Sequence, residues 1–121
     1  MNSGIRKLTN KFTRLRSKYG GRCGYCGIEV PDDQFALDHV IPRAAGGDSS
    51  ESNLMFCCCS CNMSKNARDV GEFRDFLRLK NSTLRGIIQP RQYRKLLEAG
   101  VDLSAFVASD FQFFFEKQAE L

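Results

Sequence analysis

Two Cys-x-x-Cys pairs constrain this chain more than any other feature. The first is Cys23/Cys26, the second is Cys58/Cys61, and 31 residues separate them. Four thiolates at this spacing favour a closed tetrahedral zinc site, with Zn–S distances of about 2.3 Å and no open position for water. Binding of such an ion contributes on the order of 10 kcal/mol to folding at neutral pH, so we expect a structural Zn²⁺.

Residues 57–59 are all cysteine, so the partner of Cys61 must be chosen among them. The x₂ spacing selects Cys58 and leaves Cys57 and Cys59 without a role in the metal site. Free cysteine is commonly a small buried apolar residue, and we expect both side chains to be buried.

The alternative for six cysteines in 121 residues is a secreted disulfide framework. Residues 1–22 contain seven Lys/Arg and no apolar run, unlike a signal peptide, and no stretch approaches the length of a membrane span. We therefore expect no membrane partner and a cytoplasmic location, in a bacterium or a phage-infected host cell. Reduced Cys-x-x-Cys pairs bind zinc in such a compartment.

The net charge of +4 conceals an asymmetry along the chain. Residues 1–22 carry seven positive charges and no negative one, whereas residues 96–121 hold one lysine against five acidic residues. A basic segment that leads into the metal site suits a polyanionic partner. The competing interpretation is a solvated helix face.

The apolar spacing predicts an α+β core behind an N-terminal helix. A stripe at steps of three and four residues predicts a basic helix over residues 1–20, with Ile5, Leu8, Phe12, Leu15 and Tyr19 on its inner face. Residues 35–41 predict a strand that Pro42 ends, residues 43–52 a loop, and residues 53–57 a second strand. A helix is expected from Cys61 or Asn62 to about residue 68.

The C-terminal part is predicted to be helical. A stripe continues to Lys80, with a candidate kink at Gly71, and another helix is expected between Pro90 and Gly100. A last helix, capped by Asp102 or Ser104, would carry Leu103, Phe106, Val107, Phe111 and Phe114. Phe113 and Phe115 widen its apolar face, so this helix is expected either to be buried on two sides or to form a dimer contact.

A set of polar residues between and beside the cysteines indicates catalysis. His39 is the only histidine; it follows Asp38, and Asn53 and Asn62 lie further along the chain. A neutral imidazole can activate water near neutral pH, because its unperturbed pKa is about 6.5. A divalent ion beside it could stabilise charge on a phosphoryl group and a leaving oxygen. The combination suits hydrolysis of a phosphodiester.

These residues resemble a known family. The run Leu37-Asp38-His39-Val40-Ile41-Pro42, then Gly46-Gly47, Ser52-Asn53-Leu54, and Cys58-x-x-Cys61-Asn62-x-x-Lys65 is similar to the HNH endonucleases of the ββα-metal fold, in the branch with Asn at the third position. The resemblance covers about residues 20–68. It implies that His39 is the general base, that Asp38 and Asn62 bind the catalytic ion, and that Asn53 orients His39 across the loop. These oxygen ligands suit Mg²⁺ or Mn²⁺.

The resemblance also implies a partner and an organisation. We expect a single domain over residues 1–121, made of a basic helix (1–20), a zinc-bound ββα-metal core (21–68) and a helical extension (69–121). The expected substrate is double-stranded DNA, contacted at its phosphates and nicked by a monomer with low sequence specificity. The candidate phosphate contacts are Arg14, Arg16, Lys18, Arg22, Arg43 and Lys65.

Two matters stay open at this level. Specificity could come from a homodimer or from a larger nuclease or packaging complex. The competing function is a zinc module without catalysis that binds nucleic acid through its basic helix.

Overall fold

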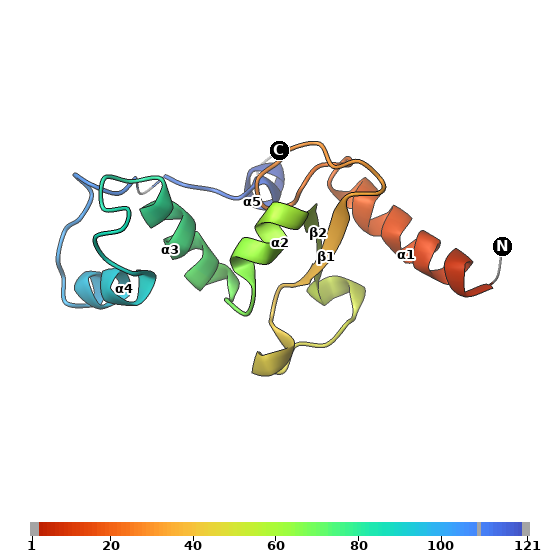
Figure 1. Cartoon of the computed structure of the whole chain (residues 1–121), viewed down its shortest axis with the longest axis horizontal. Coiled ribbons are helices and arrows are strands. Elements are labelled where there is room, and N and C mark those ends of the chain that lie inside the picture. The colour runs from red at the N-terminus through yellow and green to blue at the C-terminus, as the bar shows by residue number, and fades with distance from the viewer. Residues whose placement is uncertain (1–2, 109, 120–121) are drawn as a thin grey trace. The chain divides into compact units, whose positions relative to one another are not determined.

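The computed structural model describes residues 3–108 and 110–119, with side chains described from residue 10 onward. In chain order the elements are α1 (Ser3–Lys18), β1 (Phe35–His39), β2 (Leu54–Cys58), α2 (Cys59–Lys65), α3 (Val70–Lys80), α4 (Pro90–Glu98) and α5 (Phe114–Ala119) (Figure 1). The chain divides into two compact units. The first unit comprises Met1–Ala67 with Gln112–Leu121, and the second comprises Arg68–Phe111.

The first unit is built on an antiparallel hairpin of β1 and β2. Phe35 pairs with Cys58 at one end, and His39 pairs with Leu54 at the other. Every residue of β2 is buried, whereas β1 is mostly half-buried. Because α2 begins directly after Cys58 and contacts both strands, it runs from the cysteine end of the hairpin back toward the histidine end. This is the ββα arrangement that the sequence predicts.

Helix α1 packs on the hairpin through its apolar face. The ring of Phe12 stacks on Phe35 with centroids 4.1 Å apart and lies 5.8 Å from the ring of Phe56. Leu15 and Tyr19, further along the same face, are buried. The predicted stripe is therefore confirmed from Phe12 onward, while the side chains of Ile5 and Leu8 lie outside the described residues.

The first Cys-x-x-Cys turn is covered by the C-terminal segment. The backbone N–H groups of Phe114 and Phe115 donate to the carbonyls of Tyr25 and Gly24, at 2.9 and 2.8 Å. Phe113 is fully buried in the first unit. Gly24 also lies against β2, because its N–H donates to the carbonyl of Phe56 at 2.8 Å and a Cβ at that position would lie 2.1 Å from the Sδ of Met55.

The second unit contains α3 and α4. A capping box between Asp69 and Glu72 starts α3, and Pro90 occupies the first turn of α4. The core of this unit holds Leu79, Tyr93 and Val107, with Leu84, Ile88, Leu97 and Leu103 packed around them.

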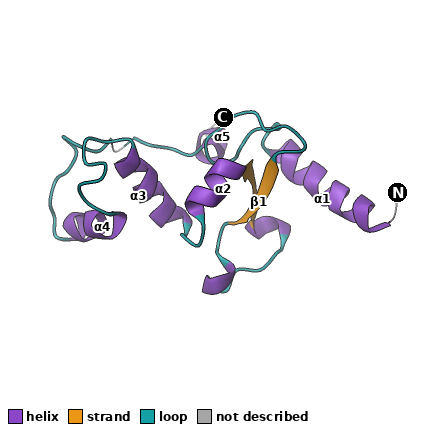
Figure 2. Ribbon diagram, viewed as in Figure 1, coloured by secondary structure: helices purple, strands orange, loops and turns teal. Residues whose placement is uncertain are grey.

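The predicted helix after Asp102 is wrong. Residues 101–108 and 110–113 form loop and turns, and α5 begins only at Phe114 (Figure 2). Asp102 accepts a hydrogen bond from the backbone of Ser104, but only a single turn follows it. Val107 is buried in the core of the second unit and Phe113 in that of the first. Because this segment contributes apolar side chains to the cores of both units, these side chains do not lie along one face of a helix.

Other predicted boundaries shift by a few residues. Helix α2 starts at Cys59 and ends at Lys65, where Asn66 adopts a positive φ of 49°. No kink occurs at Gly71, which lies in the first turn of α3. The predicted extension 69–121 is shared between the two units, and their action as a single domain stays a prediction.

Candidate metal centre and active site

The four predicted cysteines converge on one point. The Sγ atoms of Cys23, Cys26, Cys58 and Cys61 all lie within 4.8 Å of one another, and those of Cys26 and Cys58 are 3.8 Å apart. A tetrahedron with Zn–S distances of about 2.3 Å has edges of about 3.8 Å. The backbone N–H of the last cysteine in each pair donates to the Sγ of the first, at 3.4 Å in both cases. This arrangement is positioned to hold a metal ion, and the all-thiolate donor set suits zinc.

The pKa values of the cluster are compatible with a bound cation. A hydrogen bond with the Cys61 thiol lowers the pKa of Cys23 to about 4. Burial raises the pKa of Cys26 to about 11. The hydrogen bond therefore favours a thiolate at Cys23, and burial disfavours one at Cys26. A bound divalent cation would stabilise all the thiolates together.

The two remaining cysteines differ from each other. Cys57 is fully buried as predicted, and its Sγ lies 3.6 Å from the carbonyl of Ala36. Cys59 is exposed, so the expectation of burial is wrong there. The reason is its position in the first turn of α2, where its side chain reaches only the carbonyl of Gln34 at 3.4 Å.

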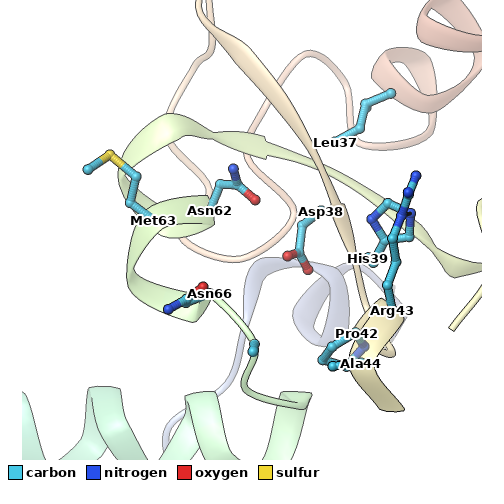
Figure 3. A pocket seen from close by; sticks show the side chains of 10 residues that line it. Leu37, Asp38, His39, Pro42, Arg43, Ala44, Asn62, Met63 and Asn66 are labelled. Carbon is cyan, nitrogen blue, oxygen red and sulfur yellow. Dashed lines mark hydrogen bonds between the residues drawn. The ribbon is translucent and has the colours of Figure 1, made fainter. Parts of the chain in front are cut away.

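A polar cleft of about 520 Å³ lies in the first unit, lined by the end of β1, the following turn and α2. Asp38, His39, Arg43 and Asn62 are among its walls. In Figure 3 the carboxylate of Asp38 and the amide of Asn62 face each other, while the His39 ring lies with Arg43 on the other side of the strand. Successive strand residues alternate in direction, and both reach the cleft because β1 ends at His39.

Asp38 is buried and held by two donors on one oxygen. The hydroxyl of Tyr25 donates to Oδ2 at 2.6 Å, and the Nζ of Lys65 lies 3.0 Å from the same atom. Among the described residues, no hydrogen bond or ion pair reaches Oδ1. Burial and the nearby carboxylate raise the pKa of Tyr25, which keeps its hydroxyl protonated as a donor.

Two side chains, Arg43 and Ser49, contact the Nε2 nitrogen of His39. Arg43 Nε donates to His39 Nε2 at 3.2 Å, and Ser49 Oγ lies 3.0 Å from the same nitrogen. Arg43 also donates to Ser49 Oγ at 3.1 Å. Because a guanidinium can only donate, Nε2 carries a lone pair in this arrangement and the ring proton resides on Nδ1. The nitrogen that meets Arg43 is therefore able to accept a proton.

Asn53 holds the loop rather than the imidazole. Its Oδ1 accepts from the N–H of Ile41 at 2.9 Å, and its Nδ2 donates to the carbonyls of Ile41 and Asp48 at 3.1 and 2.8 Å. The expected bonds across the loop are present, but they go to backbone groups, so any effect on His39 is indirect. Gly47 packs against the backbone that Asn53 binds, because a Cβ at position 47 would be 1.7 Å from the carbonyl oxygen of Ile41.

The candidate phosphate contacts divide into three groups. Lys65 is fully buried against Asp38 and donates to the carbonyl of His39 at 2.8 Å, a position that argues against a phosphate contact. Arg43 lies beside the imidazole. The remaining four, Arg14, Arg16, Lys18 and Arg22, lie on α1 or just after it. Three of them pair with acidic side chains while staying 42–60% exposed: Arg14 with Glu51, Arg16 with Asp32 and Arg22 with Glu29.

Part of the basic helix supports the cleft. Arg14 Nε donates to Glu51 at 3.0 Å, and Lys11 Nζ donates to the carbonyl of Ser49 at 2.9 Å. These bonds tie α1 to the loop that carries Ser49. Sequence reasoning missed this role, and it also missed Tyr25 and Ser49. The position of Tyr25 between two metal ligands was the only available signal for it.

The oxygen donors fit a hard divalent cation. Among the described residues Oδ1 of Asp38 has no partner, and the Asp38 carboxylate and the Asn62 amide both line the cleft (Figure 3). Carboxylate, amide and water oxygens are the ligands that Mg²⁺ and Mn²⁺ prefer.

Part of the first unit is similar to known proteins. Residues 23–68 match the family model described as HNH endonuclease. The chain is also 31% identical, over 67 residues, to the CRISPR-associated endonuclease Cas9 of Corynebacterium diphtheriae. That match covers 54% of this chain and 6% of the Cas9 protein. The family resemblance predicted from residues 20–68 is confirmed, with an α+β fold and a four-cysteine site. Across the described residues, no helix is long and apolar enough to cross a membrane.

Proposed function

We propose that this chain is a metal-dependent DNA endonuclease that hydrolyses phosphodiester bonds, nicking one strand as a monomer with low sequence specificity. The observation that carries the proposal is the convergence of Asp38, His39 and Asn62 on one polar cleft. The match to the HNH endonuclease family supports a nuclease in general.

The proposed catalytic roles follow from the geometry of the cleft. His39 Nε2 takes the proton from the attacking water, a step worth roughly 10²–10⁴-fold. Asp38 Oδ1 and the Asn62 amide would hold Mg²⁺ or Mn²⁺, which when bound supplies charge stabilisation for the phosphoryl and leaving oxygens. In-line displacement needs the base and the leaving-group side on opposite flanks of the phosphorus. The separation of the imidazole from the facing pair suits this requirement (Figure 3).

Arg43 and Ser49 would orient the proposed general base, His39. They orient the imidazole through Nε2, so substrate must displace at least one of them before water can occupy that position. The guanidinium of Arg43, once released, lies where it can bind a phosphate oxygen.

The partner in this proposal is double-stranded DNA. The guanidinium groups of Arg14 and Arg22, the partly exposed guanidinium of Arg16 and the ammonium of Lys18 would contact its phosphates. Phosphate contacts position a protein without reading sequence, so specificity would need a homodimer or a larger complex.

The test is cleavage of supercoiled plasmid with Mg²⁺ or Mn²⁺, compared with EDTA, for the wild type and His39→Ala. We expect nicked circles from the wild type only, with unchanged duplex affinity in the variant. Asn66→Gly, which removes another amide from the cleft wall and tolerates the positive φ of 49° at that position, is the matched control and should nick normally. Cleavage by His39→Ala at the wild-type rate would refute the proposed base. DNA binding without any metal-dependent cleavage would favour the non-catalytic zinc module.

A further inference from the structure

We infer that Tyr25 is a positioning residue for the catalytic ion: its hydroxyl holds Asp38 so that one carboxylate oxygen faces the cleft. This inference rests on the proposed function and adds to it a residue outside the cleft. It also gives the four-cysteine turn a role in catalysis beyond folding.

The hydrogen bond itself is short and buried. Tyr25 Oη lies 2.6 Å from Asp38 Oδ2, and the two residues are 2% and 4% exposed. Hydrogen bonds to an ionised acceptor are shorter and stronger than neutral ones, and low local polarity strengthens them further.

The aromatic ring that carries the hydroxyl has little freedom. It packs edge-on against Phe113 and Phe115, with centroids 5.3 and 6.3 Å away. The backbone carbonyl of Tyr25 accepts from Phe114, and the metal ligands Cys23 and Cys26 flank it on both sides. The direction of the hydroxyl is therefore set by the metal turn and the C-terminal segment together.

The contact matters for the ion because both donors bind the same oxygen of Asp38, Oδ2. Lys65 and Tyr25 both reach Oδ2, which leaves Oδ1 for the cleft. The terminal torsion of an aspartate has a broad energy profile, so a carboxylate is not oriented by its own rotamer preference. Lys65 balances the charge of Asp38, and the second donor restricts the rotation of the carboxylate.

A purely structural tyrosine would not need its hydroxyl. The ring fills the core and packs on the phenylalanines, and phenylalanine would do both equally well. Tyr25→Phe thus isolates the hydrogen bond from the packing. Two controls accompany it: Tyr19→Phe makes the same change at a buried tyrosine away from Asp38, and Phe113→Leu loosens the packing of Tyr25 but keeps the hydroxyl.

The experiment measures two properties of zinc-loaded protein. One is the Mn²⁺ dissociation constant, from the electron paramagnetic resonance signal of free Mn²⁺, and the other is the Mg²⁺ concentration for half-maximal plasmid nicking. We expect Tyr25→Phe to raise both by about tenfold, as befits loss of one hydrogen bond to a charged group. Zinc content should be unchanged, Tyr19→Phe should behave like the wild type, and Phe113→Leu should raise both values by less than Tyr25→Phe does.

Three outcomes would overturn the inference. Tyr25→Phe could match the wild type in both measurements, Phe113→Leu could raise both values equally, or Tyr25→Phe could lose its zinc. Failure of the proposed function looks different: the wild type would bind Mn²⁺ without nicking DNA, and the Mn²⁺ constants would still decide the role of Tyr25. A wild type that binds no Mn²⁺ would refute both.

Discussion

Replacing Lys65 by methionine should destabilise the protein strongly. Lys65 is fully buried, and its ammonium pairs with Asp38, whose side chain is 5% exposed. Lys65→Met keeps much of the side-chain volume but leaves the carboxylate buried with Tyr25 as its only described donor. Removing one partner of a buried ion pair costs about 3–5 kcal/mol. That is a large share of a total stability of about 5–15 kcal/mol, and at roughly 4 °C per kcal/mol it lowers Tm by about 12–20 °C.

The assay is urea unfolding at saturating zinc, followed by circular dichroism, for Lys65→Met, Asp38→Asn and the double variant. Asp38→Asn in the Lys65→Met background removes the uncompensated charge, so the double variant should be more stable than Lys65→Met alone. Lys18→Met is the control, because an exposed lysine on α1 should change stability by less than about 0.5 kcal/mol.

The result also separates two roles for Lys65. A lysine that binds phosphate would leave stability unchanged when replaced, and would reduce the salt dependence of duplex binding instead. If Lys65→Met lowers the free energy of unfolding by less than about 1 kcal/mol, or if the double variant is no more stable than Lys65→Met, the buried ion pair is refuted. The phosphate contact of Lys65 would then become the better explanation.

Three further predictions concern other parts of the structure. Gly47→Ala should reduce nicking and lower Tm, because its Cβ would collide with the carbonyl of Ile41; a variant with wild-type melting and cleavage would contradict this. Cys61→Ser, or chelation of zinc, should unfold the first unit, with a loss on the order of 10 kcal/mol; circular dichroism would detect it, and an inactive variant of full stability would argue against it. Arg94→Met should cost about 1–3 kcal/mol in urea unfolding, since Asp75 is buried and Arg94 half-exposed; Arg91→Met, a change at an exposed arginine, is the control.

Local spacing was sufficient to predict the metal centre and the hairpin. The x₂ spacing of both cysteine pairs was enough to select the four thiols that converge, and a short, mostly apolar run that ends at Pro42 was enough to indicate a strand. The sequence also placed Asp38, His39 and Asn62 in one cleft through a family resemblance. The structure of the C-terminal segment was harder to predict. The sequence identifies Val107 and Phe113 as apolar, but no local pattern indicates that they are buried in different cores.

The amino-acid sequence alone determined which residues bring chemistry to this protein: the cysteines, one imidazole, and the carboxylate and amides around it. Tertiary structure alone decided what each charged or polar side chain touches. Lys65 is buried against Asp38, Tyr25 donates to the same carboxylate, and Asn53 binds backbone rather than the imidazole. The physical reason is that residue type and spacing limit the reach of a side chain. Its partner depends on which distant segments pack beside it, and on the cost of leaving a buried charge unpaired.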